Sequence, residues 1–195
     1  MTDSTTTDLP TREVAGLTVP QPAVYDIDTS HSELTFSVRH MMVSKVRGRF
    51  GQVSGAITFA EALEDSSVEV DIDVASVDTG APDRDGHLRS ADFFDVESYP
   101  QITFRSTGVK DLDGDTFTLE GDLTVRDVTR PVSFRATYNG LGQNPWGAVV
   151  VGFEGRIEID REDFGLTWNQ ALETGGVLVG KVATIDIAVE ATPRG

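Results

Sequence analysis

The stretch Ser67-Val68-Glu69-Val70-Asp71-Ile72-Asp73-Val74 alternates between apolar and polar side chains. The valines and the isoleucine fall on one side, and the acidic residues fall on the other. A period of two is typical of a β-strand with one face on a core and the other in water. The β-branched content excludes a helix over the same residues. We therefore predict a half-buried strand over residues 67–77.

The same period recurs along the chain from Ala23 onward. Within residues 33–39, for example, Leu34, Phe36 and Val38 share one face. Short links such as Asp111-Leu112-Asp113-Gly114-Asp115 favour tight turns, so neighbouring strands should be antiparallel. Further strands are expected over 24–27, 48–59, 101–109, 116–125, 131–138, 148–160 and 182–191. This pattern predicts an all-β fold, an antiparallel β-barrel of about eight strands.

Residues 78–100 interrupt the alternation. The run Arg84-Asp85-Gly86-His87-Leu88-Arg89-Ser90-Ala91-Asp92-Phe93-Phe94 has an amphipathic helical pattern instead. We expect one or two short helices there.

The chain of 195 residues suits one large all-β domain. Residues 1–21 are rich in Thr and Asp and contain Pro10 and Pro20, so they bury too little to offset the entropy of ordering. We predict a flexible tail over 1–21, with Val14, Leu17 and Val19 as its candidate anchors, and a single barrel domain over 22–195. The N-terminus has no basic start followed by a long apolar stretch, so a cytoplasmic protein without stable membrane insertion is expected.

The composition excludes several classes of function. A formal net charge of −16 repels phosphate backbones and anionic lipid headgroups, so nucleic acid is not an expected partner. The chain has no cysteine, which excludes disulfides and thiol chemistry.

No pattern typical of a catalytic or metal site is present. His31, His40 and His87 are far apart and lack zinc-site spacing, and a metal would require them to converge with a carboxylate. No serine lies in Gly-x-Ser-x-Gly. We expect no catalytic residue, no metal and no cofactor.

The alternation does not decide whether the barrel is hollow or solid. An eight-stranded barrel is either filled by its own side chains or holds a small ligand. Small residues share the inward registers with large apolar ones and leave room there; they are Ser106, Gly108, Gly121, Ala136 and Gly155. Inward glycines also serve bends, so a packed core stays open as an alternative.

Several ordered motifs resemble the YceI-like family of polyisoprenoid-binding proteins. They are Tyr25-Asp26-Ile27-Asp28-Thr29-Ser30-His31-Ser32, residues 36–50, residues 84–96 followed by Tyr99-Pro100, residues 121–132, and Asp163-Phe164-Gly165-Leu166-Thr167-Trp168-Asn169. Tyr25 and Asp127 depart from the family, which usually has Trp and Gly at these positions. Together the motifs span roughly residues 23–191.

The resemblance implies a lipocalin-like barrel that binds, carries or stores a long polyisoprenoid, such as a quinone tail, without covalent chemistry. It also implies a possible homodimer. The expected cavity lining is Phe36, Val38, Met42, Phe50, Ile57, Phe59, Val70, Ile72, Leu88, Phe93, Phe104, Phe117, Leu119, Phe134, Tyr138, Phe153 and Trp168. The expected headgroup contacts at the mouth are Arg39, His40, Arg84, Asp85 and His87.

Two alternatives remain at this point. One is an enzyme that uses His87 or Asp85 as an acid or base on a bound lipid. The other is a packed, ligand-free barrel that acts as an interaction module through its edges or through residues 78–100.

Overall fold

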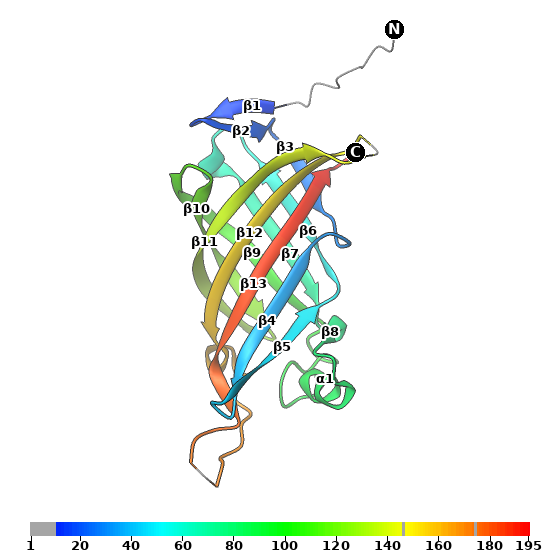
Figure 1. The fold of residues 1–195 in the computed structure, drawn as a ribbon, viewed down its shortest axis with the longest axis vertical. Coiled ribbons are helices and arrows are strands. Elements are labelled where there is room, and N and C mark those ends of the chain that lie inside the picture. Colours follow the sequence, from blue (N-terminus) through cyan, green and yellow to red (C-terminus); the bar gives the residue numbers. More distant parts are fainter. Residues whose placement is uncertain (1–10, 146, 174) are drawn as a thin grey trace.

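A computed structural model describes residues 11–145, 147–173 and 175–195. The chain forms an antiparallel β-barrel, with a small hairpin at one end and a helix at the other (Figure 1). The strands are β1 Thr11–Val14, β2 Leu17–Pro20, β3 Ala23–Ile27, β4 Glu33–His40, β5 Ser44–Phe50, β6 Val53–Phe59, β7 Ser67–Asp73, β8 Val77–Asp78, β9 Gln101–Asp113, β10 Thr116–Val125, β11 Val128–Gln143, β12 Val149–Asp160 and β13 Val179–Pro193.

The barrel closes with eight strands, as the sequence predicts. The ring runs through β3, β6, β7, β9, β10, β11, β12 and β13, and β12 pairs with β13 to close it. β3 and β4 pair with successive parts of the same edge of β13. β5 then pairs with β4, and β8 pairs with β5. Closure leaves the long strands without a free edge.

The register puts the predicted apolar faces inside. Phe104 lies opposite Val70 on one neighbour and opposite Leu123 on the other, and both partners line the interior. Two apolar clusters result. One contains Val53, Ile72 and Phe164, and the other contains Tyr25, Phe59 and Val151.

Tight turns join the long strands, as predicted. Gly114, with φ of 60°, lies in the link between β9 and β10. The predicted link over 139–147 is shorter in the structure, because β11 continues to Gln143 and its pairing with β12 includes a bulge between Tyr138 and Gly140. A bulge bends a strand and lets it follow the curvature of a barrel.

The predicted helical interruption forms one α-helix, α1 Pro82–Arg89. Proline suits the first turn because the backbone N–H missing there would have no partner in the helix. Short 3₁₀ helices occur at Leu63–Asp65, Val74–Ser76 and Arg161–Phe164. Among the residues described, no helix is long and apolar enough to cross a membrane.

Residues 11–20, which fall within the predicted flexible tail, form the hairpin β1–β2. Val19 is buried, and Val14 and Leu17 pack on the same cluster, so these candidate anchors do contact the body. Arg12 also donates to the carbonyl oxygens of Ala60 and Glu61. The rest of the predicted tail, residues 1–10, lies outside the described residues.

Candidate ligand-binding site

A cavity of about 580 Å³ occupies the barrel interior, so the barrel is hollow. At one end, which we call the cap end, its wall includes Leu17 and Val19 of the β1–β2 hairpin. At the opposite end, which we call the helix end, it includes His40 and Leu178. The structure places every residue of the expected lining on this wall except Met42. These residues are Phe36, Val38, Phe50, Ile57, Phe59, Val70, Ile72, Leu88, Phe93, Phe104, Phe117, Leu119, Phe134, Tyr138, Phe153 and Trp168.

Aromatic rings form the wall near the cap end. Phe153 is central there, with ring centroids 5.3 Å from Tyr138, 6.1 Å from Phe59 and 6.3 Å from Phe117. These residues come from four strands, and they meet because each lies on an inward register position. Such a surface offers dispersion contacts along its length and few polar partners, which suits a hydrocarbon.

A tyrosine hydroxyl on this wall also holds the cap, in addition to the hydrogen bonds of Arg12. Tyr138 Oη donates to the carbonyl oxygen of Thr18 in β2 at 3.1 Å. Burial, together with the nearby Tyr25, raises the pKa of Tyr138 to about 12. The hydroxyl is therefore protonated and able to donate throughout the neutral range.

The helix end is more polar. His87 of α1 packs against Trp168 with centroids 4.6 Å apart and against Phe93 at 5.1 Å, both edge-on. The Nε2 atom of His87 lies 2.9 Å from Oδ2 of Asp92. The structure also places Arg39, His40 and Arg84 on the cavity wall here, so the expected mouth residues lie together, with one exception.

That exception is Asp85, whose expected position at the mouth is wrong. Its side chain is only 7% exposed and accepts hydrogen bonds from the backbone N–H and the hydroxyl of Thr79. The carboxylate ties α1 to the end of β8 and does not line the cavity. This placement also removes Asp85 as an acid or base at the mouth.

The expected inward position of Met42 is wrong as well. Met42 lies in the turn between β4 and β5, and its side chain is 64% exposed. The β4 strand ends at His40, so the inward alternation stops two residues earlier.

Arg161, a buried charge on the cavity wall, is not among the site residues expected from the sequence. Its side chain is 4% exposed, and its guanidinium donates to the carbonyl oxygens of Gly180, Leu166 and Val179. Burial lowers the pKa of Arg161. No local pattern marks this residue, because its partners come from the loop that follows and from the start of β13.

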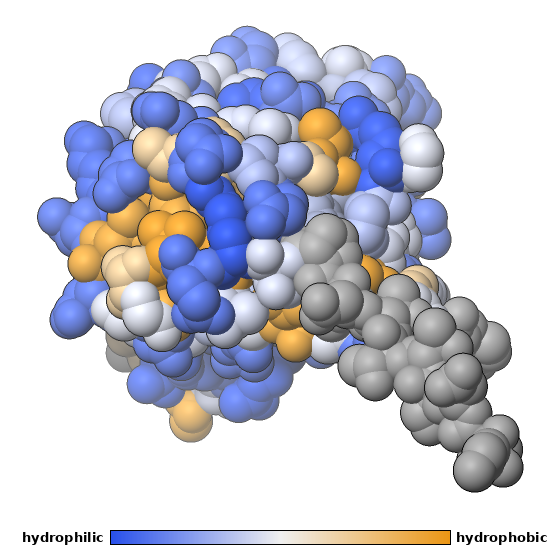
Figure 2. Space-filling model, turned by 90° about the horizontal axis from the view of Figure 1, so that it is seen from above, coloured by the Kyte–Doolittle hydropathy of each residue, from blue (hydrophilic) through white to orange (hydrophobic). Residues whose placement is uncertain are grey.

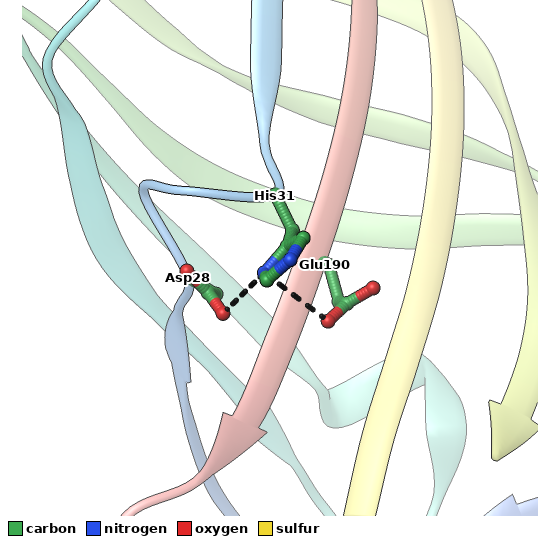
Figure 3. A group of neighbouring side chains, drawn as sticks. All are labelled: Asp28, His31 and Glu190. Atoms are coloured by element: carbon green, nitrogen blue, oxygen red, sulfur yellow. Dashed lines mark hydrogen bonds and ion pairs between the residues drawn. The ribbon is translucent and has the colours of Figure 1, made fainter. Parts of the chain in front are cut away.

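A second polar cluster lies on the outer side of the barrel (Figure 3). His31 Nδ1 is 2.9 Å from Oδ2 of Asp28 and 3.9 Å from Oε1 of Glu190. The hydrogen bond to Asp28 raises the pKa of His31, and hydrogen bonds from Ser30 and His31 lower the pKa of Asp28 to about 2. One side-chain atom each of Asp28, His31 and Glu190 that could bind a metal lies within 4.8 Å of the other two. His40 and His87 are elsewhere, on the cavity wall. His31 is therefore apart from His40 and His87, and the three histidines do not converge on one site.

The outer surface contrasts with the interior. Seen from the cap end, hydrophilic residues cover most of the molecule, and apolar residues show in several separate patches among them (Figure 2). The outside is thus mainly hydrophilic on the face shown in Figure 2, while large apolar side chains line the cavity.

Comparison with known proteins agrees with this architecture. Residues 25–191 match the family described as "YceI-like domain". A UPF0312 protein of Azotobacter vinelandii is 39% identical over 153 residues, which cover 78% of this chain and 80% of the relative.

Solved structures share the fold. BcnA of Burkholderia cenocepacia superposes with a TM-score of 0.73 at 27% identity, over 85% of this chain and 99% of that one. A polyisoprenoid binding domain from Saccharophagus degradans, implicated in plant cell wall breakdown, has a TM-score of 0.68 at 17% identity, over 89% and 100% of the two chains. Because the matched residues span nearly the whole barrel and its cavity, the chain belongs to the YceI-like family.

Proposed function

We propose that this protein binds a long polyisoprenoid lipid, such as the tail of a quinone, non-covalently in its barrel and carries or stores it. The observation that carries the proposal is the cavity, which has an apolar wall and extends from β2 to the β4–β5 turn. Its volume of about 580 Å³ falls in the range of about 300–1,000 Å³ that is usual for ligand pockets.

The energetics favour a hydrocarbon chain. Each buried methylene contributes about 0.8 kcal/mol, so one five-carbon isoprene unit contributes up to about 4 kcal/mol. A few units are enough for tight binding without any polar contact along the wall. Polar contacts are needed only for a headgroup, and the cations and histidines of the helix end, Arg39, His40, Arg84 and His87, are available for it.

The relatives give further support. The solved domain of Saccharophagus degradans is described as polyisoprenoid binding, and it shares this barrel over almost its full length. We extend that ligand class to the present chain because its cavity has the matching chemistry.

We propose binding without catalysis. A catalytic alternative would depend on His87, whose contact with Asp92 places an imidazole and a carboxylate beside the cavity. The two proposals differ in what becomes of the lipid: a carrier returns it unchanged, whereas an enzyme converts it.

Organic extraction of the purified protein followed by mass spectrometry tests the proposal. We expect one polyisoprenoid per barrel, or uptake of an added isoprenoid by an emptied protein, with the lipid recovered unchanged. A protein that contains none and takes up none would contradict binding, and a converted lipid would favour the enzyme.

A matched pair of variants locates the bound lipid. Ala136 lines the cavity, and its neighbour Thr137 points out of the barrel. Ala136→Phe should reduce the amount of bound lipid because the new ring occupies the cavity. Thr137→Phe should leave it unchanged. Equal lipid content in both variants would place the lipid elsewhere.

A further inference from the structure

The exposed large apolar side chains of the described residues all lie near the helix end of the barrel. They are Met41, Met42, Val43, Val177 and Val182. Met41, Met42 and Val43 form the turn between β4 and β5, and Met41 N–H donates to the carbonyl oxygen of Leu178 at 2.8 Å. That hydrogen bond places Val177 beside the turn. We call Met41–Val43 and Val177 the tip.

The tip is next to two residues of the cavity wall. His40 precedes it in β4, Leu178 follows Val177, and both residues line the cavity. Figure 1 shows the β4–β5 turn and the loop before β13 at the same end as α1. A surface that contacts the tip therefore lies next to the helix end of the cavity.

The backbone conformation of the tip is one that methionine rarely adopts. Val43 N–H donates to His40 O at 3.1 Å, and the two central residues of this turn, Met41 and Met42, have φ of 51° and 61°. Two positive φ values are typical of a type I′ turn, where Asn-Gly is the usual pair. Two methionines there are conformationally unfavourable and exposed, so neither folding nor burial explains them.

The charge around the tip is also unlike the rest of the protein. Arg39, Lys45 and Arg47 are the lysine and arginine side chains that make neither an ion pair nor a hydrogen bond to any other described residue. Arg39, which also borders the helix end of the cavity, lies opposite Lys45, and Arg47 follows Lys45 on the outward face of β5. Glu173, in the loop before β13, is the carboxylate closest in sequence to Val177. Glu162, near the start of β13 in space, is already paired with Lys181.

We infer that the tip docks on the surface of an anionic lipid bilayer. Its methionines and valines enter the interface while Arg39, Lys45 and Arg47 contact anionic headgroups. Exposed apolar side chains beside unpaired cations are the combination that binds such surfaces. The inference rests on the proposed function, because docking there would place the helix end of the cavity where an isoprenoid leaves or enters the membrane.

The net charge of −16 does not oppose this contact decisively. Electrostatic interactions are screened within about 8 Å at physiological ionic strength, so carboxylates on the far strands contribute little at the contact. The local charge of the β4–β5 ribbon is what the membrane meets. The acidic remainder disfavours any other orientation.

Flotation of the full chain with vesicles tests the inference. We expect binding to vesicles of phosphatidylcholine mixed with phosphatidylglycerol and much weaker binding to phosphatidylcholine alone. Lys45→Glu with Arg47→Glu should lower the bound fraction at least about tenfold. The matched control is Lys110→Glu with Arg135→Glu, two exposed cations on the outer wall away from the tip, which changes the net charge equally and should retain binding.

A second variant separates docking from folding. Met41→Asn with Met42→Gly supplies the residues that the turn favours, so its melting temperature should equal or exceed that of the wild type, while vesicle binding falls. Loss of binding in a more stable protein cannot be due to misfolding. Wild-type protein that fails to bind, or tip variants that bind as well as the control, would overturn the inference.

Two further readouts distinguish the remaining explanations. The tip could instead join two copies of this chain. In that case light scattering shows a dimer for the wild type and a monomer for the tip variant, and neither floats with vesicles. That result would overturn docking. Lipid content is measured in parallel by extraction. Vesicle binding by a protein without any isoprenoid would support docking and refute the proposed function, and the opposite result would refute docking alone.

Discussion

The ring of Phe104 in β9 lies over Gly121 in β10, where an added Cβ atom would clash with the ring. The two strands shift register beside this position, between Glu120 and Gly121. The space that an inward glycine leaves is therefore occupied by a neighbouring aromatic ring. Gly155 and Phe134 repeat the arrangement, with the ring 3.0 Å from the position of a Cβ atom. These glycines let large rings lie flat on the wall of the cavity.

Gly121→Ala should destabilise the barrel. The added methyl group meets both the Phe104 ring and the backbone oxygen of Arg105, so the ring has to move, at a cost of about 1–3 kcal/mol. Gly108→Ala is the matched control, because Gly108 lies opposite the neighbouring Glu120 and a Cβ atom there meets nothing closer than 3.6 Å. Urea denaturation of both variants measures the difference. Equal stability would show that Phe104 does not lie over the glycine.

The strands were predictable because their signal is local. The alternation over 67–74 specifies both a strand and its inward face, and the same holds for every long strand of the barrel. Closure of about eight strands followed from their number and their short links. The hollow interior did not follow, because it depends on how rings such as Phe104 and Phe134 pack over glycines of adjacent strands.

The errors arise where tertiary contacts decide. Met42 continues the inward alternation in the sequence, but the backbone turns after His40 and exposes it. Asp85 belongs to a helix whose buried side is not apolar, so the pattern gave no sign that its carboxylate binds Thr79. The role of Arg161 depends on carbonyl groups of a distant strand, which no local motif contains.

Tyr138→Phe should loosen the cap. The variant removes only the hydroxyl that donates to Thr18 O, so the β1–β2 hairpin loses one hydrogen bond worth about 1 kcal/mol. We expect faster proteolysis within residues 11–20 and a small fall in stability. The folded-state pKa of Tyr138 is raised to about 12, so its contribution is complete below pH 10 and is lost as the pH rises further. The difference between wild type and variant should therefore shrink at very alkaline pH; unchanged proteolysis would show that the hydroxyl does not hold the hairpin.

Arg161→Lys should be strongly destabilising although it keeps the charge. The guanidinium donates from three nitrogens in different directions, to Gly180, Leu166 and Val179, and an ammonium cannot reach all three carbonyl oxygens. Carbonyl groups left buried without donors cost about 1–3 kcal/mol each. Thermal unfolding measures the loss, and Lys181→Arg, at an exposed position nearby, is the control. A melting temperature within a degree or so of the wild type would mean that the loop does not depend on these hydrogen bonds.

The contact of His31 with Asp28 and Glu190 should make the stability depend on pH in two opposite directions. The pKa of His31 is raised in the fold, chiefly by its hydrogen bond to Asp28, so its stabilisation is complete below about pH 6.5 and is lost as the pH rises through the folded-state value. The pKa of Asp28 is lowered to about 2, chiefly by its hydrogen bond from Ser30 and then by that from His31, so its stabilisation is complete above about pH 4 and is lost on further acidification. Both contributions are present together only between these limits.

His31→Gln tests this directly, because it keeps a polar side chain that does not titrate. The wild type should exceed the variant most in stability near pH 5, and the difference should shrink toward pH 8 as His31 loses its proton. His40→Gln is the matched control for the substitution itself, since His40 lies on the cavity wall away from these carboxylates. Because Ser32 Oγ and the backbone of Glu190 also join this turn to β13, at 3.1 Å, the variant should stay folded throughout. A difference that grows with rising pH would mean that His31 is bound in its neutral form, and the proposed charge contact would be wrong.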